Sequence, residues 1–406
     1  QIFWAAGVLY VLVMHAIGLI LAALGTAASL HQQPPPPPHC DRRTSLVGLG
    51  TLATSTVTLA NGGVALPALA SPAPVASTAT ANRNTRTTPI PTWRLAGGVE
   101  FPTLGLNTAG LTADEAERAF RNALSAGISH VEFHPGVERD GLARVLRSSS
   151  ITRSNANRRS VFLTTKVETK WEQSPSPTVA AAFVREQLDW DLAALGVDYV
   201  DMLMLRESPD CLVMQAMWAE MEREKREGRT RALGVVNYCE GALRCLLSTA
   251  TERPSVNYLQ LHAGMGPDPR GLRSFGETRG IRTFAYGHLG ERASPAGDTD
   301  ELLRHPTLRR IAAAHGRSTL SEDVALRWVL QSGAAASVRP TSAFELGRGV
   351  CEATSACADG LRASADVFRW KLTAAEMKEI DALTSPQGNP TLFSSPGCPD
   401  SFFAKI

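Results

Sequence analysis

Ionisable side chains that can exchange protons near neutral pH stand beside two apolar runs of this chain. His134 follows Glu132 by two residues, so on a β-strand both side chains would point to the same side. His288 comes just after a second run, which ends at Tyr286. Imidazole can act as a general acid or base, so both histidines are candidates for proton transfer. A hydrogen-bonded loop or core histidine is the competing interpretation, and we favour it for each.

The cysteines do not indicate a metal centre. The chain has no Cys-x-x-Cys pair and no Cys/His spacing typical of zinc, so we expect no metal site. We interpret the cysteines as buried or incidental thiols rather than as a disulfide framework. They are Cys40, Cys211, Cys239, Cys245, Cys351, Cys357 and Cys398. The formal net charge is +2, with basic and acidic residues interspersed, so nucleic acid is not expected as a partner.

Short apolar runs alternate with amphipathic helices from Trp93 onward, a pattern typical of repeated βα units and a parallel sheet. Two helices carry start signals, Thr112 with Glu115 and Thr373 with Glu376, a spacing that lets the two side chains satisfy free amides reciprocally. The eight expected strands are Thr103 to Leu106, His130 to Phe133, Val161 to Lys166, Tyr199 to Leu205, Ala232 to Asn237, Val256 to His262, Ile281 to Tyr286 and Ala336 to Arg339.

Eight such units over roughly 290 residues predict a (β/α)₈ TIM barrel in the α/β class. A doubly wound sheet is the alternative. That alternative lacks the Gly-x-Gly-x-x-Gly turn that it would need to bind a dinucleotide.

The segment before the barrel differs in composition. Ile2 to Leu30 contains no charged residue and could cross a bilayer core of roughly 30 Å as a helix. A retained membrane span and a cleaved signal both remain open. Pro34 to Pro38 predict a polyproline spacer, and Ser71 to Pro91 predict a disordered linker. The predicted organisation is therefore a signal or transmembrane segment (1–30), a spacer, second targeting segment and linker (31–88), the barrel (89–384) and a tail (385–406).

The second targeting segment resembles a twin-arginine export signal. Arg42 and Arg43 precede a mildly apolar run from Leu46 to Leu66, and small residues follow as far as Ala70. Two apolar signals in series resemble the compound leaders of plastid proteins, of which the second directs entry into the thylakoid lumen. We therefore expect a plastid protein of the thylakoid lumen or membrane, and otherwise a membrane-anchored or exported one. A low-complexity leader with no second destination is the alternative.

Phrases of the barrel region resemble the aldo-keto reductase family. Leu195 to Asp201 is similar to the family's L-x-x-D-Y-V-D approach to its fourth strand, and Gly127 to Glu132 is similar to its G-x-R-H-I-D strand. Phe162 to Lys166 resembles F-V-x-S-K, and Gly228 to Tyr238 resembles G-K-I-R-x-I-G-V-S-N-F. These phrases follow one another in the family's order, which implies the same barrel from about Pro89 to Leu383.

The resemblance also implies a catalytic set that this chain has largely replaced. In the family, a tyrosine donates a proton to a substrate carbonyl while NADPH delivers hydride, a lysine paired with an aspartate assists, and a histidine orients the carbonyl. These four roles fall on Val137, Lys166, Glu132 and Arg206. Valine has no proton to give, and arginine is not a neutral donor and adds a second cation beside the lysine. His134 or His288 could replace the missing acid.

The family's cofactor contacts are partly retained. Asn237 and Tyr286 match the residues that hold the nicotinamide amide and stack on its ring. The serine expected before this asparagine is Val236, and the glutamine expected after Asn257 is Tyr258. The region expected to bind the adenosine phosphate lacks the usual order, so NADP binding could have been lost, and we interpret its last arginine as a solvated helix residue. The cofactor contacts implied by the resemblance are Thr108, Asn237, Tyr286, Arg339 and Ser342, with Thr341 and Arg348 nearby.

These substitutions predict an aldo-keto-reductase-like barrel that is catalytically inactive. It would serve as a binding or structural component, within a larger membrane protein complex of the plastid, with membrane contact through the N-terminal apolar segment if that is retained. The alternative is an active NADP-dependent oxidoreductase that reduces a small carbonyl substrate at a rearranged site of Lys166, Arg206 and His134. A third hypothesis is a regulatory barrel whose nucleotide occupancy changes its affinity for a partner. The aromatic tail, with Phe393, could cover a substrate pocket or a partner contact.

Overall fold

The computed structural model describes residues 89–148, 151, 154–168, 175–206, 208, 210–290, 300–316, 319–340, 355–388 and 390–391. The predicted membrane span or signal, the proline spacer and the twin-arginine-like segment lie outside the described residues, as do Phe393 and the end of the tail. Among the helices of these ranges, none is long and apolar enough to cross a bilayer.

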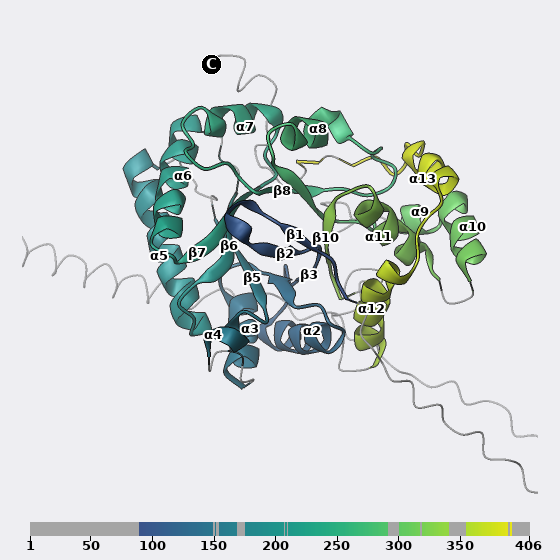
Figure 1. The fold of residues 1–406 in the computed structure, drawn as a ribbon, viewed down its shortest axis with the longest axis horizontal. Coiled ribbons are helices and arrows are strands. Elements are labelled where there is room, and N and C mark those ends of the chain that lie inside the picture. The colour runs from purple at the N-terminus through teal and green to yellow at the C-terminus, as the bar shows by residue number, and fades with distance from the viewer. Residues whose placement is uncertain are drawn as a thin grey trace, which may run out of the picture. The chain divides into compact units, whose positions relative to one another are not determined.

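Eight parallel strands close into a barrel in the order β10-β3-β4-β5-β6-β7-β8-β9 (Figure 1), which confirms the predicted (β/α)₈ fold. Each observed strand overlaps its predicted range, because the β-branched and aliphatic runs that predicted the strands are buried on both faces of the sheet. The strands are β3 (Leu104–Asn107), β4 (His130–Glu132), β5 (Phe162–Val167), β6 (Val200–Arg206), β7 (Thr230–Val236), β8 (Val256–Gln260), β9 (Arg282–Tyr286) and β10 (Ala335–Val338).

Helices surround the strands in Figure 1. The two predicted start signals are formed: Thr112 caps α2 together with Glu115, and Thr373 caps α13 together with Glu376. The helices are α2 (Ala113–Ser125), α3 (Val137–Ser148), α4 (Asn155–Arg158), α5 (Pro177–Leu195), α6 (Cys211–Arg226), α7 (Glu240–Leu247), α8 (Leu272–Glu277), α9 (Asp300–Leu303), α10 (Pro306–His315), α11 (Ser321–Gln331), α12 (Ser355–Asp366) and α13 (Ala374–Asp381).

An aromatic plug fills the barrel where its strands begin. The hairpin of β1 (Thr92–Arg94) and β2 (Glu100–Pro102) brings Phe101 edge-on to Phe162 at 5.3 Å and to Phe284 at 5.2 Å between ring centroids. His130 stacks in the same cluster and is hydrogen-bonded through Nε2, and its burial lowers its pKa to about 4. A Cβ on Gly105 would lie 2.9 Å from His130 Nδ1, so glycine is required there. Because side chains fill this end of the barrel, we expect the active site at the opposite end, where the strands finish.

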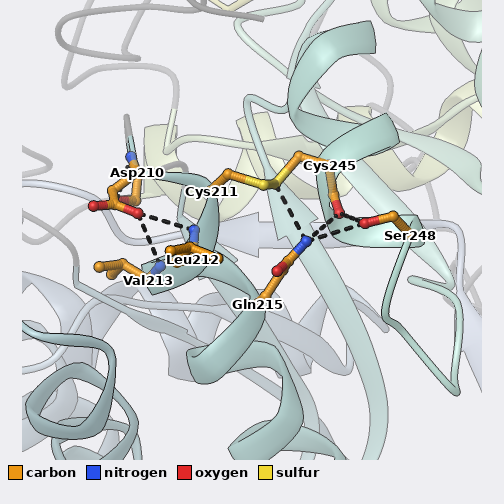
Figure 2. The surroundings of a disulfide bond; sticks show 8 residues. Asp210, Cys211, Leu212, Val213, Gln215, Cys245 and Ser248 are labelled. Carbon is orange, nitrogen blue, oxygen red and sulfur yellow. Dashed lines mark hydrogen bonds between the residues drawn. A yellow bond between two sulfur atoms is a disulfide. The ribbon is translucent and has the colours of Figure 1, made fainter. Parts of the chain in front are cut away.

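A disulfide joins Cys211, the first residue of α6, to Cys245 of α7 (Figure 2). The two Cα atoms are 5.9 Å apart, within the usual range for such a bond. Gln215 Nε2 donates to the Cys245 carbonyl at 2.9 Å, so the same two helices are also joined by a hydrogen bond. Cys239 is disulfide-bonded as well. The interpretation of the cysteines as buried or incidental thiols was therefore wrong for these three. For Cys211 and Cys245, the separation along the chain carries no sign of the contact between α6 and α7.

Removal of this disulfide should destabilise the barrel. Cys211 and Cys245 are 34 residues apart, so the bond restricts a long loop of the unfolded chain. We expect the Cys211→Ser/Cys245→Ser double variant to lose about 3 kcal/mol of unfolding free energy, measured by urea denaturation. An unfolding free energy equal to that of the unsubstituted chain would rule out a stabilising role for the bond.

Candidate active site

A buried ion pair lies inside the barrel between two neighbouring strands. Lys166 of β5 and Glu132 of β4 are both essentially inaccessible to solvent, and the ammonium contacts carboxylate oxygen Oε2 directly. The extra methylene of glutamate therefore still lets this carboxylate meet the lysine. Because each charge neutralises the other in a position closed to solvent, removal of either partner would leave an uncompensated buried charge.

Tyr258 of β8 completes this buried cluster. Its hydroxyl donates to Glu132 Oε1 at 2.5 Å, accepts from Asn107 Nδ2 at 2.9 Å and lies 2.6 Å from Ser337 Oγ. Burial, followed by the nearby Glu132 carboxylate, raises the pKa of Tyr258 well above its ordinary value. The phenol therefore stays protonated and fully engaged. Lys166 Nζ lies 5.1 Å from the centre of the Tyr258 ring, which adds a cation–π contact.

Tyr258 stands where the family resemblance implied a glutamine, and no role was predicted for it. A signal was present in the alternation along β8, where Val256 and Tyr258 both belong to the inner core of the barrel. An aromatic residue at that phase of a barrel strand points toward the axis.

His134 lies beside the ion pair with a carboxylate behind it. Its Nε2 is 3.4 Å from Lys166 Nζ, and its Nδ1 is 3.2 Å from Glu138 Oε2. The His134 side chain is 23% exposed, so it is the member of this group that a small molecule can reach. Burial opposes ionisation of Glu138, but its hydrogen bonds to His134 and the backbone amide of Gly110 lower its pKa overall. An imidazole held between a carboxylate and an ammonium can transfer a proton.

Val137 and Arg206, which stand where the resemblance implies a tyrosine and a histidine, cannot play the roles of those residues beside the ion pair. Val137 begins α3 and is 62% exposed. Arg206, at the end of β6, is paired with Glu168 at 3.3 Å, so its guanidinium has a carboxylate partner of its own. This partner was not expected from the sequence. His288 is buried, and burial lowers its pKa to about 4, so it is uncharged at neutral pH and has no proton to spare as an acid.

One buried amide group near the end of β7 is available to a ligand. The Tyr286 hydroxyl donates to Asn237 Oδ1 at 2.7 Å, which fixes the orientation of the amide. Asn237 Nδ2 is buried and has no hydrogen-bond partner among the described residues. The Asn237 backbone is also in the left-handed region, with φ of 60°, which is uncommon outside glycine and clusters at functional sites. This donor suits the carbonyl oxygen of a carboxamide.

The other expected cofactor contacts are engaged within the protein. Thr108 is buried, with its hydroxyl 3.1 Å from the Glu132 carbonyl and 3.2 Å from Glu138 Oε2. The Arg339 guanidinium donates to the backbone carbonyl of Ala109. Val236 is a buried residue of the inner core. Thr341, Ser342 and Arg348 lie outside the described residues.

Aromatic packing narrows the space beside Tyr286. The ring centres of Tyr258 and Tyr286 are 4.9 Å apart, so tyrosine fills volume that a glutamine would leave open. Asn257 does not face this space, because its side chain bonds both backbone groups of Tyr238. The fit to a nicotinamide is therefore mixed: the amide donor is present, and the position beside it carries a bulkier side chain.

The comparisons with known proteins agree with the barrel and its order of motifs. The Aldo/keto reductase family profile matches residues 97–385. An aldo-keto reductase of Mycolicibacterium smegmatis is 29% identical over 72% of this chain and 91% of its own length. The morphine 6-dehydrogenase of Pseudomonas putida is likewise 29% identical, over 72% of this chain and 91% of its own. A crystal structure of an aldo/keto reductase from Brucella melitensis superposes with a TM-score of 0.58 at 25% identity, covering 73% of this chain and all of that one.

Proposed function

Because the chain belongs to the aldo/keto reductase family, we propose that it is a member that has lost conventional carbonyl reduction and acts as a binding or structural component. Its relatives are oxidoreductases, among them a morphine 6-dehydrogenase and an NADPH-dependent codeinone reductase of Papaver somniferum.

The main support for this proposal is the chemistry of the side chains at positions 137 and 206. Val137 offers a hydrocarbon side chain where a phenol would supply the proton, and the Arg206 guanidinium is held by Glu168. The buried phenol of Tyr258 does not compensate, because burial and Glu132 raise its pKa and all its hydrogen bonds are made inside the barrel. Members of a catalytic set act together, so loss of two of them removes most of the rate.

The remaining residues support binding of a nicotinamide nucleotide without rapid turnover. When bound, NADPH would supply hydride chemistry. Asn237 would hold the carboxamide through its buried Nδ2, and Tyr286 would keep that amide in place through its hydroxyl. Position 137, where the family carries the phenol that donates the proton in conventional reduction, is a valine in this chain.

A fluorescence titration with NADPH tests the binding half of this proposal. We expect saturable binding by the full chain, weakened roughly tenfold by Asn237→Ala because a buried hydrogen-bond donor is lost. Asn122→Ala, a change on the outer helix α2, is the matched control and should bind as the unsubstituted chain does. Absence of binding at millimolar NADPH would leave a barrel without cofactor and refute this half.

The second candidate is an active oxidoreductase with a rearranged site. One observation favours it: His134 Nε2 lies 3.4 Å from Lys166 Nζ, with Glu138 against the other ring nitrogen. In this arrangement, His134 would hold the proton for a substrate oxygen. NADPH consumption that depends on an aldehyde and disappears in His134→Phe would establish this candidate in place of the first.

The location and partners that we propose are a plastid, at the thylakoid membrane or in its lumen, within a larger membrane assembly. The Cys211–Cys245 disulfide supports a compartment more oxidising than the cytosol, since such bonds persist there. Fractionation of the native source on a density gradient tests this. Comigration with a large membrane particle is expected, and recovery as a free monomer outside membranes would refute the assembly.

A further inference from the structure

A cavity of about 970 Å³ lies at the end of the barrel opposite to Asn237 and His134. Its walls come from segments that precede strands: the end of β1, the end of α6, the loop before β8 and the turn before β9. Its charged lining residues are Arg94, Lys225, Glu252, Arg253, Glu277, Arg279 and Arg282. The volume is within the range of small-molecule sites.

The residues that line the cavity carry more positive charge than the carboxylates among them neutralise. Five of these residues are cationic and two are anionic, a formal surplus of three, which exceeds the net charge of +2 for the whole chain. Lys225 pairs with Glu252. Among the described residues, the four arginines of the lining have no carboxylate partner, although salt bridges are frequent elsewhere on the barrel. They are Arg94, Arg253, Arg279 and Arg282.

Two of these guanidinium groups are held on aromatic rings. Arg282 lies 4.8 Å above the centre of the Trp93 ring, and Arg279 lies 3.6 Å above that of Phe275. Stacking occupies the face of a guanidinium and leaves its N–H edge for hydrogen bonds. Arg279 already uses one terminal nitrogen to donate to the Phe275 carbonyl and the Thr278 hydroxyl, so part of its N–H edge remains for a ligand. The side chains are therefore oriented before any ligand arrives, which lowers the entropy lost on binding.

We propose that this cavity binds a diphosphate group. Planar guanidinium groups form paired hydrogen bonds with phosphate oxygens, and two phosphates carry about three to four negative charges near neutral pH, which matches the surplus of three. The lining gathers these guanidinium groups around one pocket, which favours one compact anion over an extended acidic peptide. The site is separate from Asn237 and from the proposed nucleotide function, because it lies at the other end of the strands.

Calorimetric titration of the full chain with inorganic pyrophosphate tests the proposal. Binding is expected at low ionic strength and should weaken as salt is added, since the arginines are largely exposed. The Arg94→Gln/Arg282→Gln double variant should bind about tenfold or more weakly. Arg226→Gln/Arg309→Gln removes two exposed charges outside the cavity and should bind normally.

Further measurements distinguish a diphosphate site in this cavity from binding elsewhere on the barrel and from other ligands. Asn237→Ala should leave pyrophosphate binding unchanged, whereas loss of binding in that variant would place the anion at the other end of the barrel and overturn the assignment. Tighter binding of ADP than of pyrophosphate would identify a nucleotide as the source of the diphosphate, and equal binding would identify the diphosphate alone. A polyglutamate peptide that binds where pyrophosphate does not, or equal pyrophosphate affinity in both double variants, would refute the proposal.

Discussion

Val137→Tyr should raise the rate of NADPH-dependent aldehyde reduction by about 10²-fold or more. A phenol placed five residues after Glu132 would occupy the position of the family's proton donor, and general acid catalysis contributes about 10²–10⁴-fold. The buried pair of Lys166 and Glu132 is present, and in the family a lysine paired with a carboxylate favours the phenolate. The measurement is kcat/KM for a small aromatic aldehyde, from the loss of NADPH absorbance.

Val137→Phe is the matched control for this prediction. It adds the same ring without the hydroxyl, so it should leave the rate at the level of the unsubstituted chain. Val137 is exposed at the start of α3, and neither change should unfold the barrel. Equal rates in Val137→Tyr and Val137→Phe would show that the missing proton is not what limits the reaction.

Lys166→Met should destabilise the fold by about 3–5 kcal/mol. The change removes the partner of Glu132 and leaves a carboxylate in a position closed to solvent. The Tyr258 hydroxyl, 2.5 Å from the other carboxylate oxygen, stabilises only part of that charge. The unfolding free energy should be measured by urea denaturation monitored by circular dichroism.

Two further variants separate this effect from a simple change of side chain. Adding Glu132→Leu to Lys166→Met should recover much of the loss, because the unpaired buried charge is then gone. Arg244→Met, which breaks the exposed pair with Glu240, should change the unfolding free energy little. A double variant no more stable than Lys166→Met would mean that packing, not charge, explains the loss.

The barrel was predictable because its signals are local and repeated. Apolar runs such as Val256 to His262 mark strands wherever a sheet is buried on both faces, and Thr112 with Glu115 marks a helix start by spacing alone. The hydrophobic pattern therefore predicted each strand to within a few residues. It could not predict which helices touch, and for that reason the Cys211–Cys245 bond was missed.

The sequence predicted which strands carry Lys166 and Glu132 and which strand Asn237 follows, but it did not predict the contacts that their side chains make. The positions of Lys166, Glu132 and Asn237 follow from the order of motifs. The pairing of Arg206 with Glu168 depends on side chains that leave the barrel at neighbouring strand ends, and no sequence period records it. The contact of Tyr258 with Glu132 joins residues 126 positions apart across the barrel axis, which requires the closed sheet to be known first.

The rate of NADPH oxidation by the unsubstituted chain with a panel of small aldehydes and ketones tests the loss of conventional reduction most directly. We predict turnover below about 0.01 s⁻¹, a hundredfold under the lower end of the ~1–10³ s⁻¹ typical of enzymes, even when the cofactor is saturating. Turnover within that range, with any simple carbonyl substrate, would contradict the account and return this barrel to the active members of its family.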